Sequence, residues 1–138
     1  MAVRTYRESR GDGSAVKSYG VSTGRIDVSW YDTDITVVAL AGEHDLSTSD
    51  GIWRELESAI RARQAVIVDL SDAEFIDSSV IHQLMKADKL ARSEGTRVTL
   101  QLETAPVVQR VLQVTGLERH FVIAHSRELA IATAREPS

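Results

Sequence analysis

The chain has 138 residues, no cysteine and a formal net charge of −4 at pH 7. This length supports one ordinary hydrophobic core, and the lack of cysteine excludes disulfides, cysteine-based metal sites and a thiol nucleophile. The globular part is acidic, which argues against a nucleic-acid partner, and the absence of a long apolar segment predicts a cytoplasmic protein without a membrane span.

Residues 1–24 mix glycine, serine and charged residues, and they keep neither a strand period nor a helix period. They carry four basic and two acidic residues, so the acidic charge of the chain lies beyond them. This composition predicts a mobile N-terminal arm in front of a folded domain at residues 25–136.

The rest of the chain alternates between strand-like and helix-like hydrophobic patterns. An initial hairpin followed by such alternation indicates an α/β fold, with a single-layer mixed sheet of four to five strands packed with about four helices. Strands are predicted at residues 26–31, 35–41, 65–70, 96–102 and 121–123. Helices are predicted to begin after a cap at 47–49, at Ser78, at Pro106 and after Ser126.

The stretch Asp69–Leu84 joins a buried strand to an amphipathic helix through a loop that is predicted at residues 71–76. Asp77 stands where a helix N-cap is expected, so Ser78 falls on the first helical turn with its hydroxyl near the rim of the sheet. The positive end of the helix dipole would favour a phosphate there. The residues also describe an ordinary capped helix, which is the purely structural interpretation.

A second polar segment, Gly42–Leu46, is predicted as a loop between a strand and a helix. It carries Glu43, His44 and Asp45 at the carboxyl end of the strand. In layered α/β proteins such loops are where ligands and partners usually bind.

Several kinds of chemistry find little support in the chain. No glycine-rich phosphate loop follows a strand, and the histidines lack metal-ligand spacing, so the sequence predicts no cofactor and no metal. Ser78 and His82 lie one helical turn apart, and a serine nucleophile with Asp45 orienting the histidine is one hypothesis. No nucleophile elbow accompanies them. A hydroxyl that only accepts a phosphoryl group needs less, because the base, magnesium and nucleotide come from another protein.

Three motifs in this order resemble the STAS domain of bacterial anti-sigma factor antagonists, over about residues 26–134. They are Gly42-Glu43-His44-Asp45, Asp69-Leu70 through Phe75-Ile76-Asp77-Ser78-Ser79, and Ala105-Pro106 through Gly116-Leu117. The resemblance implies a mixed sheet packed on helices, no catalysis, and partner switching that regulates transcription.

In that family the unphosphorylated domain binds an anti-sigma factor that is also a serine kinase, and a sigma factor is released. The resemblance implies that this kinase phosphorylates Ser78 and that a phosphatase restores it, with the oligomeric state left open. The predicted partner surface consists of Glu43, Asp45, Asp77, Ser79, Val80 and His82.

Val80 and His82 occupy places where the family commonly has a glycine and a small residue. They favour an alternative in which Ser78 merely begins a helix. The protein is then a non-switching STAS scaffold or an accessory subunit of a larger complex, of the stress-signalling or lipid-transport type.

Overall fold

The computed structural model describes residues 5–10, 15–21 and 23–136. Its strands form one mixed sheet in the order β1-β2-β3-β4-β5-β7-β8, and β6 pairs with β4 outside this path. The pairs from β1 to β4 are antiparallel, and all the others are parallel. The strands are β1 Thr5–Arg10, β2 Ala15–Val21, β3 Gly24–Tyr31, β4 Ile35–His44, β5 Ala65–Asp69, β6 Ala73–Ile76, β7 Val98–Gln101 and β8 Ile123–Ala124.

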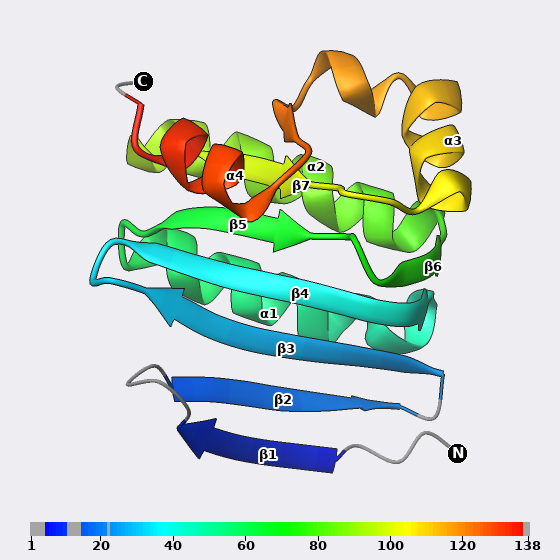
Figure 1. Cartoon of the computed structure of the whole chain (residues 1–138), viewed down its shortest axis with the longest axis horizontal. Helices are drawn as coiled ribbons and strands as arrows, with labels where there is room; N and C mark the ends of the chain where they lie inside the picture. The colour runs from blue at the N-terminus through cyan, green and yellow to red at the C-terminus, as the bar shows by residue number, and fades with distance from the viewer. Residues whose placement is uncertain (1–4, 11–14, 22, 137–138) are drawn as a thin grey trace.

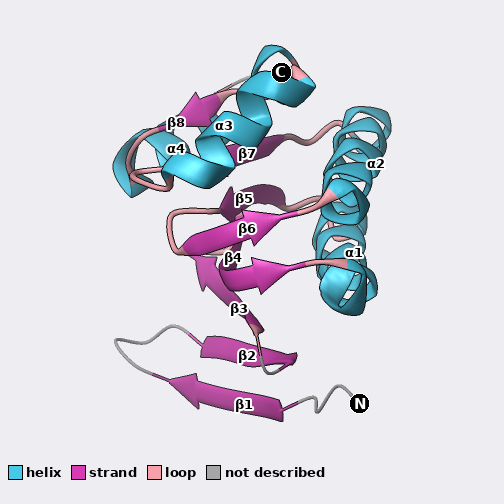
Figure 2. Cartoon of the chain, turned by 90° about the vertical axis from the view of Figure 1, so that its right-hand side faces the viewer, coloured by secondary structure: helices cyan, strands magenta, loops and turns pink. Residues whose placement is uncertain are grey.

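Helices cover both faces of the sheet (Figures 1 and 2). Helices α1 and α2 lie side by side on one face, and their buried side chains share the larger core cluster with β3, β4, β5, β7 and α3. Helix α4 packs on the opposite face against β5, β7 and β8, over a smaller cluster that includes Ile35, Val37 and Ile67. The helices are α1 Leu46–Arg61, α2 Ser78–Glu94, α3 Pro106–Thr115 and α4 Arg127–Ala134, with a 3-10 turn at Leu117–Arg119.

The predicted fold class is confirmed, and the helix ends follow the sequence signals. Asp77 caps α2, and Gly95 ends that helix in the left-handed conformation. Gly116 ends α3 in the same way, and Ser126 caps α4. Each of these ends is set by a residue whose side chain or backbone freedom satisfies terminal backbone groups locally, so local sequence was enough to find it.

The predicted loop at residues 42–46 is wrong, and so is the predicted loop at residues 71–76. Strand β4 continues through Gly42 to His44, because β6 pairs with it in parallel there. Strand β6 continues the line of β5 along β4 after the interruption at residues 70–72. The local sequence did not show a four-residue strand whose partner lies some thirty residues away, which is why the predicted strand count was too low.

The structure also differs from the predicted N-terminal arm. Within residues 1–24 it places strands β1 and β2, which extend the sheet beyond β3 in an antiparallel hairpin. The hydroxyl of Ser18 donates a hydrogen bond to the carboxylate of Asp27 on β3. Backbone hydrogen bonds to neighbouring strands stabilise this segment, although its glycine and serine content does not predict strands.

We predict that Gly42→Ala lowers the free energy of unfolding by about 2–4 kcal/mol. Gly42 has a φ of 81°, and a Cβ at this position would collide with the carbonyl oxygen of Thr23. Gly95→Ala is the matched control, because Gly95 has a φ of 73° but open space around a Cβ. Urea unfolding measures both variants, and equal losses would contradict a role for the close approach at Gly42.

Candidate functional site

Two strand-to-helix corners lie side by side at the carboxyl ends of β4 and β6, a region that we call the carboxyl edge of the sheet. Strand β4 leads into α1, and β6 leads into α2 (Figure 2). His44 and Ile76 are register partners at the ends of these strands, and the amide of Asp77 donates a hydrogen bond of 3.2 Å to the carbonyl of His44. Asp45 and Asp77 are therefore neighbours, each at the start of a helix.

The α2 corner presents a free serine hydroxyl. One carboxylate oxygen of Asp77 accepts hydrogen bonds from the amides of Ser79 and Val80, at 2.9 and 3.3 Å, and from the Ser79 hydroxyl. Ser78 is the first residue of the helix, and its side chain is exposed. Within the described part of the chain its hydroxyl has no hydrogen-bond partner. Asp77 thus fixes the corner and leaves Ser78 accessible.

The α1 corner repeats this arrangement. Asp45, and not the expected residues 47–49, caps the helix by accepting hydrogen bonds from the Ser47 amide at 2.9 Å and from the Ser47 hydroxyl at 2.6 Å. The Ser47 hydroxyl, followed by its amide, holds the pKa of the Asp45 carboxyl below its usual range. Leu46 occupies the first helical position, which Ser78 occupies in α2.

His44 stabilises the α1 corner from inside the protein. Its side chain is fully buried. Nδ1 lies 3.0 Å from the hydroxyl of Thr48, and Nε2 lies 2.9 Å from the carbonyl of Ala41. Since a carbonyl only accepts, Nε2 carries the proton and Nδ1 accepts from Thr48. Burial lowers the pKa of this imidazole, which keeps it neutral.

The structure places most of the predicted partner residues on this edge, with one correction. Glu43, Asp45, Ser78 and His82 are exposed, and Asp77 and Ser79 are half-buried around the α2 corner. Val80, however, is fully buried in the core beneath α2. Its position three residues after the cap turns its side chain toward the sheet, so it does not belong to the accessible surface.

The arrangement lacks the contacts that a serine hydrolase requires. Asp45 bonds to Ser47, and no hydrogen bond joins His82 to Ser78 or Asp45 among the described residues. Across this same part of the chain, no three His, Asp or Glu side chains converge as a metal site would need. None of the described helices combines the length and apolar character needed to cross a membrane.

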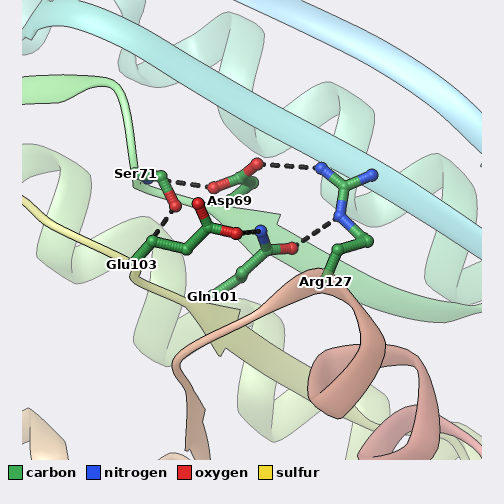
Figure 3. A network of polar contacts seen from close by, with 5 residues as sticks. All are labelled: Asp69, Ser71, Gln101, Glu103 and Arg127. Carbon is green, nitrogen blue, oxygen red and sulfur yellow. Dashed lines mark hydrogen bonds and ion pairs between the residues drawn. The ribbon is translucent and has the colours of Figure 1, made fainter.

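A polar network holds the β5–β6 loop that leads to this site, and sequence analysis missed it (Figure 3). Arg127 at the start of α4 donates to Asp69 at 2.8 Å and to Gln101 at 2.6 Å. Asp69 also accepts from the amide of Ser71 at 2.9 Å, and the Ser71 hydroxyl accepts from the amide of Glu103 at 3.1 Å. The network links three segments that are distant in sequence. Sequence motifs therefore included only one member of it, Asp69 of the Asp-Leu motif.

The fold and these two corners define the chain as a STAS domain. The family model described as Mlab, STAS domain matches residues 31–124, more than half of the chain, and the chain belongs to this family. The resemblance read from the sequence motifs is confirmed.

Known relatives agree with this assignment. An anti-sigma F factor antagonist from Paenibacillus polymyxa is 31% identical over 85 residues, which are 60% of this chain and 72% of that protein. An anti-sigma factor antagonist from Mycobacterium paratuberculosis has the same fold, with a TM-score of 0.73 and 23% identity over 83% of this chain and 96% of that one. The Bacillus cell fate determinant SpoIIAA in its phosphorylated form gives a TM-score of 0.63 and 22% identity over 80% and 99% of the two chains.

We predict that His44 makes stability depend on pH. Because its folded-state pKa lies below the ordinary value of 6.5, the unfolded chain binds the proton first as the pH falls. Protonation of His44 therefore does not affect the free energy of unfolding above pH 6.5. Below that pH the free energy of unfolding falls, by up to about 1.4 kcal/mol per pH unit. Urea unfolding between pH 5 and 8 should show this slope in the parent chain and in His82→Gln, and a smaller slope in His44→Gln. The same slope in all three would contradict the assignment.

We predict that Arg127→Gln lowers the free energy of unfolding by about 1–3 kcal/mol, because Asp69 and the buried Gln101 lose a charged donor. Arg92→Gln is the control: its ion pair with Asp88 lies on the surface of α2, and we expect a loss below about 1 kcal/mol. Thermal and urea unfolding measure both. A loss no larger than that of Arg92→Gln would contradict a stabilising role of the network.

Proposed function

We propose that this chain is an anti-sigma factor antagonist that binds an anti-sigma factor with serine kinase activity and thereby releases a sigma factor. Ser78 is the phospho-acceptor, and a phosphatase restores the unmodified form. The chain acts by binding and is not an enzyme. The contact surface is the carboxyl edge with Glu43, Asp45, Asp77, Ser79 and His82, and Val80 no longer belongs to it.

The observation that carries this proposal is the state of Ser78. Its hydroxyl is exposed. The Asp77 cap holds the start of α2 in place through hydrogen bonds to Ser79, not to the Ser78 hydroxyl. A kinase brings its own base, magnesium and nucleotide, so an accessible hydroxyl on a fixed corner is all that the substrate has to provide. The name of the Paenibacillus polymyxa relative and the phosphorylated form of the Bacillus structure support the same function.

Charge gives the modification its effect. A phosphate adds about −1.5 to −2 at neutral pH, beside the carboxylates of Asp45 and Asp77. The amino end of α2 tolerates the phosphate, since its dipole favours negative charge. A partner seated on the edge would have to desolvate the new dianion, and its affinity would fall.

A second candidate is a fixed STAS binding module, as in an accessory subunit. It is favoured by His82, an exposed imidazole one turn after Ser78 where the family commonly has a small residue. Val80 no longer supports the fixed module, because its side chain is buried and does not obstruct a partner on the surface.

Substitution of Ser78 separates the two candidates. Titration calorimetry with each anti-sigma factor kinase encoded in the same genome should find one that binds the parent chain. We expect Ser78→Ala to keep that affinity and to abolish phosphate incorporation, as intact-mass analysis would detect. Ser78→Asp should weaken binding at least about tenfold.

Ser58→Asp is the control, because this exposed serine lies on α1. It should leave affinity unchanged. Equal binding by Ser78→Ala and Ser78→Asp, without phosphate on the parent chain, would favour the fixed module. No binding by any of these kinases would overturn the proposed function.

A further inference from the structure

Two large apolar side chains stand exposed on the edge that carries Ser78. Leu46 is 76% exposed, the highest fraction among the large apolar side chains of the described residues, and Phe75 is 42% exposed. Single exposed apolar residues are common on protein surfaces. These two differ because both lie at the paired ends of β4 and β6, where the helix that carries Ser78 also begins.

The strand register fixes their positions. Leu46 begins α1 as Ser78 begins α2, and the two helices start from the paired ends of β4 and β6 (Figure 2). Adjacent packed helices lie about 8–10 Å apart. Phe75 is the register partner of Glu43 and lies three residues before Ser78. Leu46 thus begins the helix next to that of Ser78, and Phe75 lies on the strand that leads into Ser78.

The two segments that form the corners are acidic. Segments 42–53 and 64–85 contain no lysine or arginine. Both corners therefore present negative charge that their own segments do not balance. The carboxylates that the two corners carry are those of Glu43, Asp45, Asp50, Asp72, Glu74 and Asp77.

We propose that Leu46 and Phe75 are the apolar anchors of the partner contact, and that the partner offers an apolar surface bordered by lysine or arginine. The inference rests on the proposed function and specifies the chemistry of the anti-sigma factor that fits. Charge complementarity favours this occupant over a second copy of the chain, since two copies would bring like-charged edges together.

The anchors also sharpen the effect of phosphate. A phosphate on Ser78 would lie at the same end of the sheet as two side chains whose contact requires the removal of water. The hydration of the phosphate therefore opposes the burial of these side chains by a partner. Affinity in the unmodified form should depend on the apolar pair, and association rate should depend on the carboxylates.

The test compares matched truncations in titration calorimetry with the kinase that binds the parent chain. Leu46→Ala and Phe75→Ala should each weaken binding by about ten- to fiftyfold. The controls are Leu129→Ala on α4, where the side chain is 58% exposed, and Trp30→Ala on β3, where it is 39% exposed. Trp30 pairs with the start of β4, at the end of that strand opposite to Glu43. Both controls should bind within about twofold of the parent. Glu43→Gln should slow association and reduce its salt dependence.

The outcomes separate the inference from the function on which it rests. A parent chain that binds and is phosphorylated, with Leu46→Ala and Phe75→Ala binding like the controls, overturns the anchors and leaves the function intact. Circular dichroism and unfolding of both variants exclude misfolding as the cause of a loss. A parent dimer in sedimentation experiments that Leu46→Ala dissociates would assign the surface to a second copy and overturn the inference.

Discussion

The parallel pairing of β4 with β6 is the constraint on which this structure depends. Gly42 makes it possible, because its left-handed backbone and missing Cβ let the end of β4 pass the carbonyl of Thr23. The hydrogen bond from the Asp77 amide to the His44 carbonyl then sets the starts of α1 and α2 next to each other. Without this pairing the two corners would be separate helix starts, and their side chains would not share a surface.

Capping decides what the edge offers to a partner. Asp45 and Asp77 each satisfy backbone donors of a first turn, and each also holds the serine two residues later. The residue between, Leu46 in α1 and Ser78 in α2, is left exposed and without a capping role. Two similar caps therefore present two different groups, one apolar and one able to accept a phosphate. In the proposed function, the edge therefore combines an apolar contact residue with a residue that is modified.

Support for the edge comes from residues that no partner needs to touch. Buried His44 links the end of β4 to the first turn of α1 through Thr48. Arg127 reaches from α4 to Asp69 and Gln101 on the other face of the sheet.

The sequence by itself determined the fold class, the motif corner and the cap at Asp77, because hydrophobic periodicity and helix capping act over a few neighbouring residues. It did not reveal β6 or the network around Arg127, since their hydrogen bonds join segments far apart in the chain. It also missed the hairpin strands in residues 1–24, because glycine and serine have low strand propensity. Packing alone decides that Val80 is buried in the core, and that Leu46 and Phe75 are exposed at the paired strand ends from which the helix of Ser78 begins. Which side of an element is covered depends on what packs against it, and local sequence does not contain that information.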